Sequence, residues 1–187
     1  MATHVALLRG INVGGRNKVP MAELREVVTS LGHAGVTTYI QSGNVLFTTD
    51  GDDTAKLAVA LEAAITGTFG IKSSVVVLSR DELAQVLERN PYQDEPNPKL
   101  VHVVFLNGQP SPDLAERIKA AQSAAAAKGS RDTVTTIGSA LYLHTPDGFG
   151  NSELAQVLLR VLGKAGLVAT ARNLATTGKL LTLCEEQ

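Results

Sequence analysis

Cysteine is almost absent from this sequence, and its scarcity excludes two classes of site. The single thiol, Cys184, cannot form an internal disulfide or supply a multi-cysteine zinc site. The opening residues lack the basic start and apolar run of a signal peptide, and no stretch approaches the roughly 20 apolar residues that span a bilayer. We therefore expect a cytoplasmic protein with no membrane partner.

Aromatic residues and a surplus of either charge are also lacking. Aromatics make up 4% of the 187 residues, and 17 basic residues against 18 acidic ones leave a net charge of −1. Proteins that wrap nucleic acid usually carry excess Lys and Arg, and RNA-recognition sheets carry exposed aromatics, for which the first half offers only Phe47. Nucleic acid is thus a disfavoured partner, and any anion binding must be local.

The composition is globular, with 44% apolar residues, and strand patterns alternate with helical ones. In the first half, strands are predicted at 4–9, 36–40, 45–49 and 73–78, and helices at 20–31 and 53–69. This order, βαββαβ, is that of a ferredoxin-like unit.

The second half repeats the scheme. It predicts strands at 101–106, 133–137, 140–144 and 167–169, and helices at 113–128 and 152–162. Thr170 is expected to cap a last helix that reaches toward Cys184. The seven residues from His4 match those from His102 at an offset of 98, which indicates an internal duplication.

These patterns predict an α+β fold of two ferredoxin-like (α–β plait) subdomains related by internal duplication. The first subdomain is expected to span 1–78 and the second 99–187, including the C-terminal helix. Between them, 79–98 holds a connecting helix, opened by a capping-box pattern at Ser79, and a linker with three prolines.

Two polar segments should lie at the same end of the first sheet. The first two strands run parallel because a helix returns the chain between them, so the loop 9–18 and the turn 41–44 meet at one end. Cationic side chains, amides and glycine N–H groups ahead of a helix favour a phosphate or carboxylate. The candidate ligand-binding residues are Arg9, Asn12, Gly14, Gly15, Arg16, Lys18, Gln41, Ser42 and Asn44.

The glycines of the loop 9–18 match neither a P-loop nor a dinucleotide fingerprint. The competing interpretation is a tight turn with solvated charges. An internal comparison favours the anion site, because the equivalent loop 107–111 has no cation. The topology alone therefore does not require the three cations of the first loop.

Other candidates for chemistry are weaker. His102 and His144 lie on neighbouring antiparallel strands and would hold a metal if they met on one face with a third ligand, but no such ligand is placed to help. Ser42 lacks the elbow motif of a serine nucleophile, and Cys184 lies among leucines. We expect no metal and no cofactor, and no catalytic residue is identified.

The tail segment 170–173 contributes a further possible pair of ligand residues, Arg172 and Asn173. A helix beginning at Thr170 would place this arginine in its first turn, where a cation opposes the helix dipole. That local conflict suggests a ligand or a partner, and a salt bridge elsewhere in the fold explains it equally well.

The blocks 6–15, 20–25 and 39–45 closely resemble the bacterial domain-of-unknown-function family 1697, and shorter blocks at 90–91, 102–103, 141–143 and 170–173 continue the resemblance. It implies two ferredoxin-like subdomains and no established activity, cofactor or catalytic residue. Two positions depart from the family pattern: Glu153 stands where a lysine is common, and Leu174 stands where a tryptophan is usual.

Three functions are therefore open. The first is binding of, or chemistry on, a small anionic or phosphorylated ligand at the edge formed by 9–18 and 41–44. The second is a nucleic-acid-associated module that uses the same cationic edge. The third is a non-catalytic protein-interaction domain.

Overall fold

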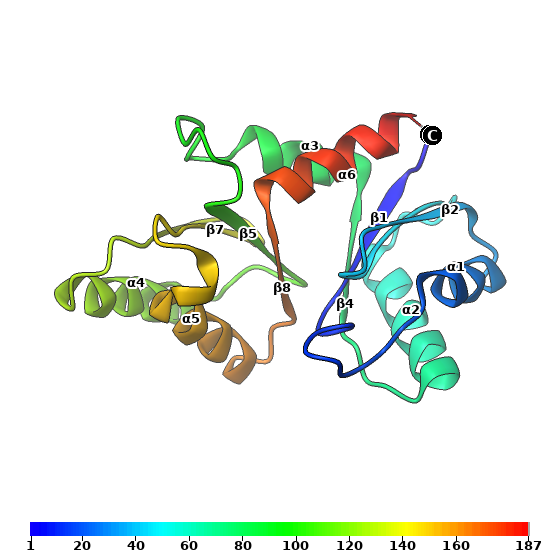
Figure 1. Cartoon of the computed structure of the whole chain (residues 1–187), viewed down its shortest axis with the longest axis horizontal. Helices are drawn as coiled ribbons and strands as arrows, with labels where there is room; N and C mark the ends of the chain where they lie inside the picture. Colours follow the sequence, from blue (N-terminus) through cyan, green and yellow to red (C-terminus); the bar gives the residue numbers. More distant parts are fainter. Residues whose placement is uncertain (187) are drawn as a thin grey trace. The chain divides into compact units, whose positions relative to one another are not determined.

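The computed structural model describes residues 1–186 and shows an α+β protein, as expected (Figure 1). Within that range the strands form two four-stranded antiparallel sheets, accompanied by six α-helices. The chain divides into two compact units. Unit 1 comprises Met1–Gln85 and the residues from Gly178 onward, and unit 2 comprises Val86–Thr177.

Unit 1 is a sheet with two helices on one of its faces. Its elements follow in the order β1 (His4–Leu8), α1 (Met21–Ser30), β2 (Ala34–Tyr39), β3 (Asn44–Thr48), α2 (Thr54–Phe69) and β4 (Val75–Ser79). The strands lie in the order β2-β3-β1-β4, and every neighbouring pair is antiparallel. β1 and β2 therefore run parallel with β3 between them, as the helical return requires.

The core of unit 1 lies between the sheet and these helices. Side chains alternate along a strand, so Ala6 and Leu8 of β1 face the helices together with Phe47 of β3. Leu24 of α1 and Leu61 of α2 pack against them, and all five are inaccessible to water. Burial of one leucine side chain stabilises the fold by roughly 1.5–3 kcal/mol.

Unit 2 has the same arrangement. Its elements are β5 (Val101–Leu106), α4 (Pro112–Ala127), β6 (Thr133–Ile137), β7 (Ala140–His144), the 3₁₀ turn η1 (Phe149–Asn151), α5 (Glu153–Lys164) and β8 (Ala169–Asn173). The strands lie in the order β6-β7-β5-β8. Leu114 and Ile118 of α4, and Leu154 and Leu158 of α5, pack with Val104 of β5 to form its core.

The central strands of the two sheets pair in the same register. The equivalent pairs are His4↔Phe47 and His4↔Ser79 in unit 1, and His102↔Leu143 and His102↔Asn173 in unit 2. The connections also close alike, because Leu8 N donates to Gly43 O at 2.8 Å and Leu106 N donates to Ser139 O at 3.0 Å. The paired positions of the central strands in one unit thus have counterparts in the other.

A helix follows the last strand of each sheet directly. α3 (Arg80–Glu88) begins in unit 1, and its end belongs to unit 2, where Val86 O accepts a hydrogen bond from the Tyr142 hydroxyl at 2.7 Å. α6 (Leu174–Glu186) begins in unit 2, and its end belongs to unit 1, where Cys184 O accepts from Ala2 N at 3.0 Å.

The prediction for the tail is wrong in one respect. The segment 169–173 is strand β8, paired with β5 through Val103↔Arg172, so Arg172 does not lie in a helix's first turn. The helix begins only after Asn173, whose Oδ1 accepts from Thr176 N at 2.8 Å and takes the capping role expected of Thr170. Pairing with β5 outweighs the local capping signal, and the supposed conflict with the helix dipole disappears.

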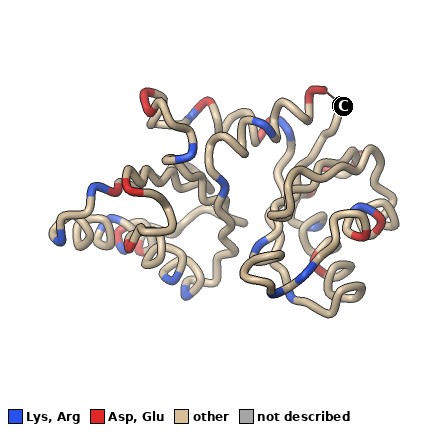
Figure 2. The backbone as a smooth tube through the Cα atoms, in the orientation of Figure 1, with Lys and Arg blue, Asp and Glu red and all other residues tan. Residues whose placement is uncertain are grey.

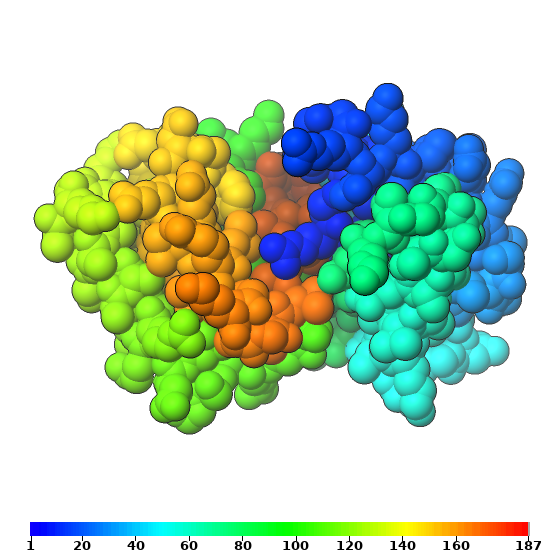
Figure 3. All heavy atoms as spheres, turned by 90° about the horizontal axis from the view of Figure 1, so that it is seen from below, coloured from blue at the N-terminus to red at the C-terminus, as the bar shows by residue number. Residues whose placement is uncertain are grey.

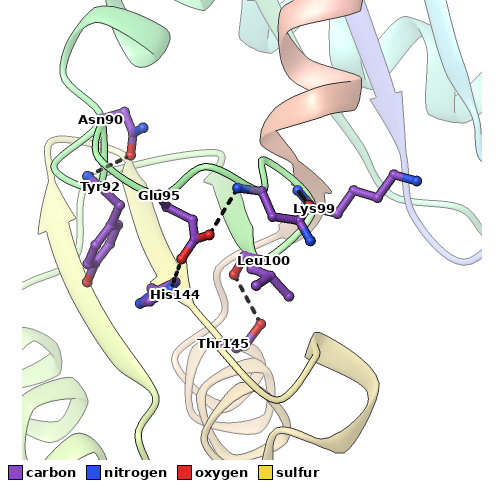
Figure 4. Close-up of polar contacts among 8 residues, drawn as sticks. Asn90, Tyr92, Glu95, Lys99, Leu100, His144 and Thr145 are labelled. Atoms are coloured by element: carbon purple, nitrogen blue, oxygen red, sulfur yellow. Dashed lines mark hydrogen bonds and ion pairs between the residues drawn. The ribbon is translucent and has the colours of Figure 1, made fainter.

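His102 and His144 do not meet on one face of the sheet, so the condition for a shared metal is not fulfilled. His102 pairs with Leu143, and the pairing partner of His144 is Val101, so the two rings lie on opposite faces of the sheet. His144 instead pairs with Glu95 of the proline-rich linker, with 2.7 Å between Nε2 and Oε2 (Figure 4). In the described residues 1–186, no cluster of three or more His, Cys, Asp or Glu side chains could hold a metal.

Candidate functional site

The structure brings the loop 9–18 and the turn 41–44 together at one end of unit 1. The Asn12 side-chain amide donates to Gln41 O at 3.0 Å, and Leu8 N donates to Gly43 O at 2.8 Å. The turn fits closely against the loop, because a Cβ on Gly43 would lie only 2.7 Å from the Leu8 Cβ. The predicted juxtaposition of the two segments is therefore present.

A third segment, which the sequence analysis missed, joins them. Arg9 N donates to Ser74 O and the Ser73 hydroxyl donates to Arg9 O, both at 2.9 Å. The connection 70–74 leads into β4, and β4 is antiparallel to β1, so its start lies beside the end of β1. It carries a fourth cation, Lys72. The strand order alone would have predicted this neighbour.

We call the three connections 9–20, 40–43 and 70–74 the cationic end of unit 1. They contain Arg9, Arg16, Lys18 and Lys72, all exposed, and their sequences contain no Asp or Glu. Figure 2 shows the Lys and Arg positions along the connection between β1 and α1. In Figure 3 the blue atoms of the first connection lie beside the green atoms that lead into β4. The charges within these connections are all positive although the whole chain is nearly neutral, and one carboxylate beside them, that of Glu62 in α2, accepts from Val75 N at 2.7 Å.

The loop itself is a miniature hairpin. Asn12 N donates to Asn17 O at 3.0 Å, and Arg16 N donates to Val13 O at 3.1 Å. Gly14 and Gly15 form its tip with φ of 58° and 75°, the positive values that a type I′ turn requires at both central positions. The glycine N–H groups therefore lie at a hairpin tip. Five residues, 16–20, separate this tip from the start of α1 at Met21.

Two of the predicted amides have structural roles. Asn12 uses both side-chain hydrogens, on Val19 O and Gln41 O, and its Oδ1 accepts from Val19 N at 2.8 Å. Asn44 is fully buried, and its amide donates to Tyr39 O and to the Ser42 hydroxyl, each at 3.0 Å. These contacts shape the loop and the turn, and they leave Asn12 and Asn44 poorly placed to touch a ligand.

The remaining candidates occupy different positions. Gln41 and Ser42 are exposed on the turn, beside the cations. Arg172 and Asn173 lie in unit 2: the arginine donates to Thr170 Oγ1 at 3.0 Å and to Ala171 O at 2.8 Å, and burial lowers its pKa to about 10. Asn173 caps α6, which accounts for its side chain.

Two alternatives lose physical support in unit 1. Phe47, the one aromatic considered for stacking of bases, is buried in the core and has no exposed surface. Cys184 is buried as well, and desolvation raises the pKa of its thiol to about 11. The thiol therefore stays protonated at neutral pH, which makes it a poor nucleophile.

None of the helices in the described residues is long and apolar enough to span a membrane.

A four-stranded antiparallel sheet with two helices on one face, present twice in one chain, defines the structural class of this protein. The chain belongs to the DUF1697 family, described as a protein of unknown function, whose family model matches residues 1–142. The resemblance found in the sequence is thereby confirmed.

The solved structure of the conserved bacterial protein SP0830 from Streptococcus pneumoniae is similar to this one. The TM-score is 0.69, the sequence identity is 26%, and the match covers 98% of each chain. The structural similarity thus extends past residue 142, over the second half of unit 2. No curated protein matches this chain.

Proposed function

We propose that this protein binds a small anionic ligand, with phosphate as the recognised group, at the cationic end of unit 1. The anion pairs with the side chains of Arg9, Arg16 and Lys18, and Lys72 joins them from the neighbouring connection 70–74. The side chains of Gln41 and Ser42 orient the ligand by contacting its neutral part, because both are exposed on the turn next to these cations.

The observation that carries the proposal is the difference between the two units at this end. Unit 2 closes the corresponding connections with residues 107–111, 138–139 and 165–168, which hold no charged side chain. The connection after the first strand has twelve residues in unit 1 and five in unit 2. The turn between the second and third strands has four residues in unit 1 and two in unit 2. Since the same strands close without them, the added residues and cations of unit 1 are not needed for the fold.

The expected affinity is modest. Each exposed cation that comes within 4 Å of a phosphate oxygen contributes about 1 kcal/mol in water. Four such contacts amount to about 4 kcal/mol, which corresponds to a dissociation constant near 1 mM. A ligand with two phosphoryl groups engages more of the cations at once, and salt weakens its binding because the charges are exposed.

The test is a titration with inorganic pyrophosphate, followed by ¹H–¹⁵N NMR at low and high salt. We expect amide shifts in the cationic end, and a roughly fivefold weaker response for Arg16→Ala, the loss of about 1 kcal/mol. Arg117→Ala, which removes an exposed arginine of α4 in unit 2, is the matched control and should bind as the parent does. Unmoved amides in 9–18 at low salt would remove the proposal.

A single-stranded RNA oligonucleotide serves as the second titrant. A nucleic-acid module should prefer the oligonucleotide strongly and lose affinity steeply with salt, because each phosphate contact releases counterions. A site for a small ligand should bind the oligonucleotide no more tightly, per phosphate group, than it binds pyrophosphate. The buried position of Phe47 favours the second outcome.

A specific observation also supports docking of a protein at this end. Val13 and Ile40 are 67% and 51% exposed, and Ile40 has a φ of 49°, an uncommon conformation for a β-branched residue. An exposed apolar residue held in a strained conformation is typical of a contact site. Replacing Val13 and Ile40 with serine should leave pyrophosphate binding intact, and it should abolish capture of a partner if docking is the function.

The repeated topology supports a proposal about origin. We propose two ferredoxin-like subdomains, 1–78 and 99–187, that arose by internal duplication and are joined by 79–98. The equal registers of the two sheets support it, and so does the recurrence of Val-Thr-Thr at 36–38 and 134–136, again at an offset of 98. Each subdomain expressed alone should give a cooperative thermal transition with α+β circular dichroism; an unfolded 99–187 fragment would count against these boundaries.

A further inference from the structure

The tip of the loop 9–18 stands clear of the rest of unit 1. Ile11 and Val19 are buried at its base, whereas every residue from 13 to 18 is exposed. A Cβ added to Gly14 or Gly15 would meet no atom within 4 Å. The hairpin tip therefore projects from the unit, a shape suited to contact with a surface.

An apolar and a cationic side chain lie side by side on this tip. Val13 and Arg16 form an antiparallel bridge, and directly opposed residues of such a bridge place their side chains on the same face. Val13 is 67% exposed, and Arg16 is exposed as well. The tip thus presents an apolar group to the outside with a cation beside it.

A second exposed apolar residue adjoins the tip. The Asn12 side chain donates to Gln41 O at 3.0 Å, and Val13 follows the donor residue while Ile40 precedes the acceptor residue. In the described part of the chain, the large apolar side chains that are exposed all lie in unit 1: Met1, Val13, Leu31, Ile40 and Val59. Two of these five lie at the cationic end, and unit 2 has none at its corresponding connections.

The charge around the two apolar residues has one sign. The connections of the cationic end carry two arginines and two lysines and no carboxylate, and the nearby Glu62 carboxylate is engaged by Val75 N. Each cation held near an anionic bilayer strengthens binding about fivefold. Exposed apolar residues among cations are complementary to a bilayer interface, where anionic headgroups overlie acyl chains.

We propose that the cationic end docks on an anionic phospholipid surface, so that the phosphate it recognises is that of a lipid headgroup. The inference rests on the proposed function, because the same cations hold the phosphate. Val13 and Ile40 enter the boundary between headgroups and acyl chains, and Arg16 and Lys18 stay at the level of the phosphates. The expectation of no membrane partner rested on the lack of a spanning segment, and contact with one leaflet needs none.

Flotation of the full-length protein with phospholipid vesicles is the first test. Vesicles of equal parts phosphatidylcholine and phosphatidylglycerol should bind the protein at least tenfold more strongly than phosphatidylcholine alone, and high salt should release it. Arg16→Ala should bind about fivefold more weakly, and the control Arg117→Ala in unit 2 should bind as the parent does. Equal binding to both kinds of vesicle would overturn the proposal.

Val13 and Val59 form a matched pair for the apolar contact. Both are valines of unit 1 with 67% of their surface exposed, but Val59 lies on α2, away from the cationic end. Val13→Ser should weaken binding to the anionic vesicles about fivefold, because its exposed apolar surface is buried on docking, and Val59→Ser should leave binding unchanged. Equal binding of the two serine variants would refute insertion of the tip.

The chain contains no tryptophan, so one introduced indole reports how deeply the tip enters the bilayer. The fluorescence of Val13→Trp should shift to shorter wavelength on the anionic vesicles, and brominated acyl chains should quench it. Val59→Trp should show neither effect. Quenching of both variants to the same extent, or of neither, would contradict the proposed orientation.

Pyrophosphate separates this inference from the function on which it rests. Val13→Ser leaves all four cations in place, so it should give the amide shifts of the parent with pyrophosphate. Pyrophosphate shifts in 9–18 of a protein that ignores both kinds of vesicle would overturn the lipid assignment and leave the anion site standing. If that protein also lost a protein partner through Val13→Ser, the occupant of the tip would be a protein and not a bilayer.

Discussion

Gly43 is the position where the structure makes its sharpest energetic prediction. The residue lies in the turn between β2 and β3 with a φ of 81°, and its carbonyl accepts from Leu8 N. A Cβ placed on it would lie 2.7 Å from the Leu8 Cβ and 3.0 Å from the Ile11 Cδ1. Gly43→Ala therefore strains the backbone and collides with the buried end of β1.

The cost of Gly43→Ala has two parts. A left-handed conformation costs an alanine about 1–2 kcal/mol relative to glycine. Relief of the contact with Leu8 requires β1 or the turn to move, which costs a further 1–3 kcal/mol, typical of overpacking. The lower entropy of the unfolded alanine chain returns about 0.5 kcal/mol. We expect a net loss of about 3 kcal/mol, which lowers the melting temperature by about 6–12 °C in a chain of this size.

Gly14→Ala is the matched control. Gly14 also has a positive φ, 58°, but nothing lies within 4 Å of its added Cβ. It should lose only the backbone term of about 1–2 kcal/mol, less the same roughly 0.5 kcal/mol from the unfolded chain. Urea unfolding followed by circular dichroism measures both variants. Equal losses would refute the close packing of the turn on β1.

Three further predictions concern single side chains. Ile40→Asn should raise the free energy of unfolding by about 1 kcal/mol, because asparagine tolerates the left-handed conformation of this exposed residue; an unchanged urea midpoint would argue against strain. Burial lowers the pKa of His102 from about 6.5 to about 4, so the folded state favours the neutral form of this side chain. The stability that this preference contributes is lost as the pH falls from about 6.5 to about 4. The melting temperature of His102→Phe, measured from pH 7 to pH 4, should therefore fall less than that of the parent. Cys184, with a raised pKa and no exposed surface, should react with iodoacetamide at pH 8 only as fast as the protein unfolds, and rapid labelling of the native protein would contradict its burial.

The order of elements could be predicted from the sequence because it depends on short-range patterns. Spacings of three and four mark a helical face such as that of Leu24 and Val28, and apolar runs such as that at Val75 mark buried strands. The end at which the loop and the turn meet followed from topology alone.

The details that the sequence analysis missed depend on pairing between distant segments. Whether Arg172 lies in a strand or a helix depends on β5, which is about 70 residues earlier in the chain. The one-residue offset that separates His102 from His144 is equally invisible without the register. The sequence analysis took Asn12 and Asn44 for ligand-binding residues, because the sequence does not show which backbone group a polar side chain in a loop will hydrogen-bond.

The two units together form an internal control that a single domain would lack. Both units have the hydrogen bond from the end of the first strand to the following turn, donated by Leu8 N and Leu106 N, and the shared fold is sufficient to explain it. The shared fold does not explain a feature that only one unit has. Unit 1 alone carries cations in the three connections of its cationic end, and the equivalent connections of unit 2 hold no charged side chain. We therefore assign ligand recognition to unit 1, and substitutions there should affect binding more than stability.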